Sequence, residues 1–83
     1  MAKIVIYSTS HCPYCVRAKN LFTKKGLSFE EVQMDERPDE LRELKKRTGL
    51  MTVPQIFIND KLIGGFSDVA ALDEKGELDT LLK

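Results

Sequence analysis

Apolar residues recur along the first half of the chain with two different periods, which predict alternating strands and helices. Residues 3–7 form a continuous run rich in β-branched residues, as expected of a strand that is buried on both faces. From Pro13 to about Lys25 the apolar residues follow a helical stripe, and Gly26 suits the end of that helix. Residues 28–34 alternate imperfectly and predict a second strand whose ends the pattern leaves open.

The second half of the chain predicts a helix followed by a β-hairpin. Pro38 and two acidic residues open the helix, and Gly49 ends it after three basic residues that match the negative end of the helix dipole. Residues 55–58 and 61–64 predict two short strands across a two-residue turn. The first residue of that turn is Asn59, which suits a positive φ.

The chain is expected to end in two helical segments. Ser67 is a suitable N-cap for a helix through residues 69–72, and the apolar group Leu78, Leu81 and Leu82 predicts a short terminal helix. The predicted order is therefore βαβαββα, in which right-handed crossovers put helices on both faces of a four-stranded mixed sheet. This α/β arrangement is compatible with a thioredoxin-like fold in a single domain over residues 1–83, although element order alone does not single that fold out.

Composition excludes several classes of protein. The chain has 83 residues, and its 13 basic and 13 acidic residues argue against a nucleic-acid binder that works by bulk electrostatics. The apolar run at residues 4–7 is too short for a membrane span or a secretory signal. We therefore expect a cytoplasmic protein that binds neither nucleic acid nor membrane.

The neutral total hides an uneven distribution of charge. Residues 1–29 contain five basic residues and no acidic one, whereas residues 30–83 contain eight basic and thirteen acidic residues. The cationic first third could attract a small anion, or the two segments could fold together into a mixed surface.

Cys12 and Cys15 are the only cysteines, too few and too close together to hold a fold together by disulfides. In a reducing cytosol such a pair is redox-active or metal-binding. Zinc needs four ligands and the sequence offers only His11 beside the pair, which argues against a metal site. His11 itself is interpreted as an exposed residue before the helix, with a role as catalytic base as the alternative.

The position of the pair predicts thiol chemistry. Cys12 is expected at the N-cap of the helix that begins at Pro13, where unpaired N–H groups and the helix dipole favour a thiolate. Cys15 lies one turn further along, and we expect it to be more buried and able to attack a disulfide formed at Cys12.

Three motifs occur in order along the chain: Cys12-Pro13-Tyr14-Cys15, Thr52-Val53-Pro54 and Gly64-Gly65-Phe66-Ser67-Asp68. With these motifs the chain resembles the glutaredoxins, most closely the small bacterial dithiol type, over essentially all of its length.

The resemblance implies a glutathione-dependent thiol–disulfide oxidoreductase without a metal. Cys12 would be the nucleophile that takes glutathione as a mixed disulfide, and Cys15 would resolve protein disulfides. The expected partners are glutathione and disulfide-containing or glutathionylated proteins, and the chain is expected to be a monomer.

The resemblance also implies a glutathione groove, with a cis-proline turn at Val53-Pro54. Each assignment has a structural alternative: Tyr14 could pack over the helix start, Gly64 and Gly65 could serve a turn, and Ser67 and Asp68 could cap a helix. The expected glutathione-binding residues are Tyr14, Thr52, Val53, Pro54, Gly65, Phe66, Ser67 and Asp68.

The chain departs from the family pattern at Thr9, where many glutaredoxins carry a lysine near the thiolate. The missing lysine charge could raise the pKa of Cys12 or weaken glutathione binding, and Arg17, Lys19 or another basic residue of the cationic segment could compensate. Two other functions stay open. One is an iron–sulfur carrier, in which two chains share a cluster through Cys12 and glutathione. The other is a redoxin served by thioredoxin reductase, which the absence of tryptophan and of Gly-Pro between the cysteines disfavours.

Overall fold

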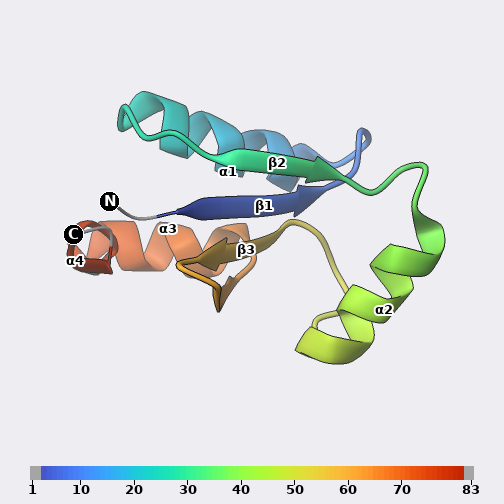
Figure 1. Ribbon diagram of the computed structural model, residues 1–83. Helices are drawn as coiled ribbons and strands as arrows, with labels where there is room; N and C mark the ends of the chain where they lie inside the picture. Colours follow the sequence, from blue (N-terminus) through green and yellow to red (C-terminus); the bar gives the residue numbers. More distant parts are fainter. Residues whose placement is uncertain (1–2, 82–83) are drawn as a thin grey trace.

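The computed structural model describes residues 3–81. Its centre is a four-stranded sheet in the order β2-β1-β3-β4 (Figure 1). β1 pairs in parallel with β2 and antiparallel with β3, and β3 and β4 form an antiparallel hairpin. The sheet is therefore mixed, as predicted. The strands are β1 (Ile4–Ser8), β2 (Glu30–Gln33), β3 (Gln55–Ile58) and β4 (Lys61–Gly64).

Helices cover both faces of this sheet. α1 and α3 lie together behind the sheet in the view of Figure 1, and α2 stands at the end of the sheet to which β1 points. Leu44 of α2 and Tyr7 of β1 line one hollow, and Tyr7 faces away from the side that Ile6 faces. The helices are α1 (Pro13–Lys24), α2 (Pro38–Thr48), α3 (Phe66–Glu74) and α4 (Glu77–Leu81).

The core lies between the sheet and the α1/α3 pair. Ile6 and Ile56 face each other across β1 and β3, and Phe22, Val69 and Leu78 from three helices pack against them without exposure to solvent. Burying each such side chain contributes about 1.5–3 kcal/mol. The apolar residue Leu78 thus anchors the predicted terminal helix, whereas Leu82 lies outside the described residues.

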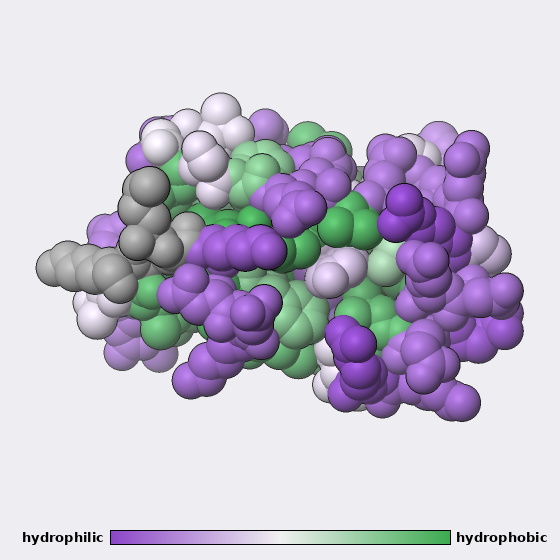
Figure 2. Space-filling view, in the orientation of Figure 1, coloured by the Kyte–Doolittle hydropathy of each residue, from purple (hydrophilic) through white to green (hydrophobic). Residues whose placement is uncertain are grey.

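The first strand was expected to be buried on both faces, but this is wrong: one of its faces is only half-buried. Ile4, Ile6 and Ser8 are buried, but Val5 and Tyr7 are only half-buried. The reason is that α2 covers only the end of their face. The surface over α2 is mostly hydrophilic in Figure 2, and hydrophobic surface gathers along the middle of the molecule.

The hairpin turn has the predicted backbone. Asn59 and Asp60 both have positive φ, of 53° and 66°, which matches the right-handed twist of the flanking strands. Within residues 3–81 no helix is long and apolar enough to span a bilayer.

A polar contact beneath the sheet ties β1, β2 and α1 together. The buried Ser8 hydroxyl donates a hydrogen bond to Glu31 Oε2 at 2.6 Å, and Lys19 Nζ lies 2.8 Å from the same oxygen. The hydrogen bond from Lys19, and then that from Ser8, lowers the pKa of Glu31 from its ordinary value. A lowered pKa stabilises the folded chain above the unfolded value, and this stability is lost as the pH falls through the folded value.

We therefore expect Glu31→Gln to lower the free energy of unfolding by about 0.5 kcal/mol at pH 7, because the Lys19 pair is partly solvent-screened. The difference from wild type should shrink below about pH 5 and vanish in stronger acid. Urea unfolding across this pH range measures it. Glu30→Gln, at an exposed neighbour on β2, is the matched control, and an equal, pH-independent loss in both variants would contradict the assignment.

Candidate active site

Cys12 occupies the N-cap of α1, as predicted. Its backbone is extended, with φ −127° and ψ 102°, and its Sγ accepts a hydrogen bond from the Cys15 N–H at 3.1 Å. On its other side the thiol donates to the Val53 carbonyl at 3.5 Å. The sulfur therefore lies between a helix N-terminus, which stabilises negative charge, and the loop before β3.

Cys15 is in a different environment although it is only three residues away. Its side chain is fully buried, whereas Cys12 is 8% exposed. Burial, and then the hydrogen bond with Cys12, raises the pKa of Cys15 to about 12, against smaller opposing effects of the Thr9 backbone and the Lys19 charge. The two thiols are thus unequal. Cys12 is slightly exposed and accepts a hydrogen bond from one N–H group at the start of α1, whereas Cys15 is fully buried as a protonated thiol.

The peptide bond between Val53 and Pro54 is cis, as the resemblance implied. The β1–β3 ladder begins only at Gln55, and no hydrogen bond within residues 3–81 uses the Val53 N–H. The Val53 backbone therefore presents an unpaired edge next to Cys12, which an extended peptide could extend.

A groove of about 320 Å³ opens beside this edge. Three separate segments supply its walls: the start of α1, the loop before β3 and the start of α3. Every residue predicted to bind glutathione lines it except Asp68. The lining residues are Tyr14, Thr52, Val53, Pro54, Gly65, Phe66 and Ser67.

Two aromatic rings form one wall of the groove. Tyr14 is 56% exposed, and its ring lies 6.2 Å from that of Phe66 at an interplanar angle of 32°. The Arg17 guanidinium lies 5.3 Å from the centre of the Tyr14 ring, a cation–π contact that keeps a positive charge at this wall. Tyr14 therefore packs against Phe66 and Arg17 and also lines the groove.

The start of α3 differs from the prediction. Gly65, not Ser67, is the N-cap, and the Asp68 carboxylate accepts a hydrogen bond from the Gly65 N–H at 3.0 Å. Gly64 has φ +132°, and a Cβ there would collide with the Asp68 carboxylate. Gly64 therefore serves the turn, whereas a Cβ on Gly65 would meet only the Pro54 carbonyl at an ordinary 3.6 Å.

Other polar residues singled out from the sequence take different places. Lys19, expected as a candidate to compensate for Thr9, is engaged by Glu31. His11 is exposed and lines a shallow hollow with Cys12 and Pro13. Within the described part of the chain, no three His, Cys, Asp or Glu side chains gather as a metal site would need. Sequence reasoning missed Gln55, a fully buried amide directly after Pro54.

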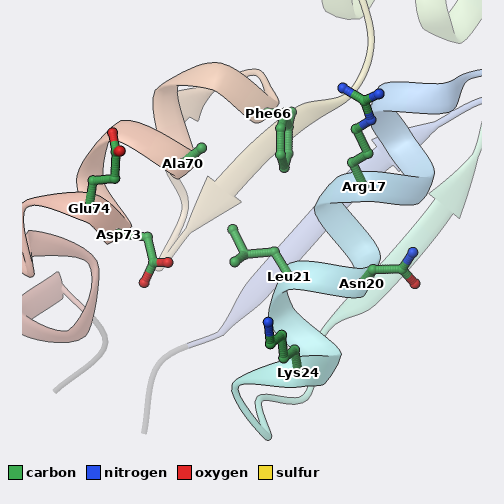
Figure 3. A pocket seen from close by; sticks show the side chains of 8 residues that line it. All are labelled: Arg17, Asn20, Leu21, Lys24, Phe66, Ala70, Asp73 and Glu74. Carbon is green, nitrogen blue, oxygen red and sulfur yellow. The ribbon is translucent and has the colours of Figure 1, made fainter.

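A hollow larger than the groove beside the thiols lies elsewhere. A groove of about 570 Å³ runs between α1 and α3, with Arg17 and Lys24 on one wall and Asp73 and Glu74 on the other (Figure 3). It contains no cysteine. Phe66 lines both grooves, so this one continues from the aromatic wall of the site away from Cys12.

Comparisons with known proteins agree on one family. The sequence model of the glutaredoxin family matches residues 4–63. Glutaredoxin 3 of Escherichia coli K12 is 51% identical over 83 residues, covering all of both chains. The solution structure of glutaredoxin from Brucella melitensis has a TM-score of 0.89 and 43% identity, over 100% of this chain and 90% of that one. The crystal structure of a buckwheat glutaredoxin–glutathione complex has a TM-score of 0.88 and 34% identity, over 95% and 74%.

The unequal thiols predict unequal alkylation. At about pH 8, iodoacetamide should modify Cys12 while Cys15 stays protected, because Cys15 is buried and protonated. In Cys12→Ser, Cys15 should react only as the pH rises several units further or when the chain unfolds. Mass spectrometry of alkylated peptides measures both rates. Equal rates at the two cysteines of the folded protein would contradict this environment.

The turn before α3 should tolerate an alanine at Gly65 but not at the neighbouring Gly64. Gly64→Ala should lower the free energy of unfolding by more than about 1 kcal/mol, because φ is positive and the Cβ collides with Asp68. Gly65→Ala, the matched control, should lower it by less than about 1 kcal/mol, the usual cost of a poorer N-cap. Urea unfolding decides, and a Gly64→Ala variant as stable as Gly65→Ala would disprove the conformational requirement.

Proposed function

The chain belongs to the glutaredoxin family and is thus a thiol–disulfide oxidoreductase, and we propose that it uses glutathione to reduce glutathione mixed disulfides and protein disulfides. The observation that carries this proposal is the contact between the Cys12 sulfur and the Val53 carbonyl at 3.5 Å. It brings a nucleophile next to an unpaired backbone edge, so that a bound peptide would present its own sulfur to Cys12.

We assign the peptide part of glutathione to the Val53 edge. An extended γ-glutamyl-cysteinyl backbone could pair there with the Val53 N–H and carbonyl, in the manner of an added strand. Tyr14 and Phe66 would cover one side of the peptide and Thr52 and Pro54 the other. The buckwheat relative, which was solved as a glutathione complex, supports a glutathione site in this fold.

Glutathione has two carboxylates and one ammonium group, and the groove offers partners for both charges. The first N–H groups of α3, at Phe66 and Ser67, are free to hold a carboxylate. The Asp68 carboxylate could hold the ammonium group while it caps Gly65. Arg17 supplies a cation at the Tyr14 wall. Thr9, at the position where many glutaredoxins carry a lysine, supplies no charge.

The reaction with a glutathionylated protein needs only Cys12. Its thiolate attacks the glutathione sulfur, a Cys12–glutathione disulfide forms, and the protein thiolate leaves and takes up a proton. A second glutathione thiolate then attacks the glutathione sulfur bound to Cys12. Oxidised glutathione leaves, and the Cys12 thiolate is regenerated. One reduced glutathione is consumed, and it leaves joined to the glutathione that came from the substrate.

A protein disulfide needs both cysteines. Cys12 attacks one sulfur of the substrate and forms a mixed disulfide. Cys15 loses its proton and attacks Cys12, which releases the second substrate thiol and leaves a Cys12–Cys15 disulfide. Two glutathiones then reduce that disulfide. This chemistry requires a supply of reduced glutathione, so we propose a reducing cytoplasmic setting.

Single cysteine variants separate the two reactions. Cys12→Ser should abolish turnover of both a glutathionylated peptide and a protein disulfide, because it removes the nucleophile. Cys15→Ser should keep the first activity and lose the second. Glutathione oxidation coupled to NADPH consumption by glutathione reductase measures both. Loss of both activities in Cys15→Ser would show that the two roles are assigned wrongly.

The electron donor is tested in the same assay. Wild-type protein supplied with thioredoxin reductase and NADPH in place of glutathione is the comparison. Faster turnover with thioredoxin reductase would replace the proposed function by that of a redoxin served by that enzyme.

A further inference from the structure

The side chain of Gln55 is the one fully buried amide among the described residues, and it lies directly after the cis-proline. Gln55 is the first residue of β3 and pairs with Tyr7 in the centre of the sheet. Its backbone is therefore held by the ladder between the two central strands. A polar group so deeply buried is costly unless all its hydrogen bonds are made, so the partners of this amide need an explanation.

All of these partners belong to the segment that precedes the cis-proline. Gln55 Nε2 donates to the Leu50 carbonyl at 2.9 Å and to the Thr52 carbonyl at 3.3 Å. Gln55 Oε1 accepts from the Thr48 hydroxyl at 2.9 Å, and this hydroxyl also accepts from the Leu50 N–H at 3.2 Å. One side chain thus binds three residues between the end of α2 and Val53.

This segment has no regular secondary structure to hold it. α2 ends at Thr48, and β3 does not begin until Gln55. Met51 and Thr52 are exposed, with Met51 at 73%. The Gln55 amide therefore supplies hydrogen bonds that a helix or a ladder would supply elsewhere, and it does so immediately next to the Val53 edge.

We propose that Gln55 is a positioning residue, whose buried amide fixes the Leu50–Thr52 loop. The Val53 backbone is thereby held beside Cys12, in the position that binds the incoming peptide. The proposal rests on the proposed function for the identity of that peptide. Gln55 does not line the groove and does not touch Cys12. Its effect must therefore pass through the loop.

Gln55→Met keeps the size of the side chain and removes all three hydrogen bonds. We expect the KM for a glutathionylated peptide to rise at least about fivefold and kcat to change by less than about twofold. The reason is that the variant loosens peptide binding, whereas the N–H donor to the Cys12 sulfur comes from α1 and is untouched. Backbone order parameters of Thr52 and Val53 should fall from about 0.85 toward 0.6.

Thr48 provides a graded comparison. Thr48→Val removes one hydroxyl from the same network and should raise KM less than Gln55→Met does. Thr48→Ser restores the hydroxyl and should return KM to the wild-type value. Adding Thr48→Val to Gln55→Met should change little further, because the bond they share is already lost.

Ile56→Val is the control for a general loss of stability. Ile56 is fully buried in the same strand and faces the opposite side of the sheet, so its truncation weakens the core without removing a hydrogen bond of Gln55. A KM that rises as much in Ile56→Val as in Gln55→Met would overturn the proposal, as would unchanged order parameters in Gln55→Met. A wild-type protein inactive toward the peptide would refute the proposed function instead, and the order parameters would still decide whether Gln55 holds the loop.

Discussion

The register between β1 and β3 is the constraint on which the site depends. Ile6 faces Ile56 in the core, and the antiparallel ladder then places Tyr7 opposite Gln55. The end of β1, which leads to Cys12, therefore lies beside the start of β3, which follows the cis-proline. A slip of one residue would turn the isoleucines to the wrong face of the sheet. The apolar core thus places the segment that leads to Cys12 beside the segment that follows the cis-proline.

Local sequence signals predicted most of the elements, because each begins or ends where one residue has a strong backbone preference. Pro13 and Pro38 start α1 and α2, and Asn59 takes the positive φ of the hairpin turn. The start of α3 was predicted wrongly because Ser67 and Gly65 are both acceptable N-caps by residue type. The choice was decided by the Asp68 carboxylate, which reaches back to the Gly65 N–H.

Contacts between distant segments could not be predicted in this way. Gln55 looks like an ordinary strand residue in the sequence, and its amide becomes a buried support only because the end of α2 folds back over it. The half-burial of Val5 and Tyr7 has a similar origin, since α2 covers only part of their face. The cysteines were identified from their spacing at the start of a predicted helix. The groove residues were identified by resemblance to a family, which already contains such long-range information.

The fold pairs two basic residues of the first third of the chain with acidic residues from later segments. The sequence left open whether the cationic first third attracts a small anion or folds into a mixed surface. In the structure Lys19 is paired with Glu31, and Lys25 lies 2.6 Å from Asp73. The hydrogen bond from Lys25 to Asp73 also raises the pKa of Lys25, so this ammonium group is committed to joining α1 to α3. Arg17 remains against the Tyr14 wall. Under the proposed function, attraction of glutathione to the groove would depend on the Arg17 guanidinium and the first N–H groups of α3 rather than on net charge. The effect of these groups is short-ranged and directional.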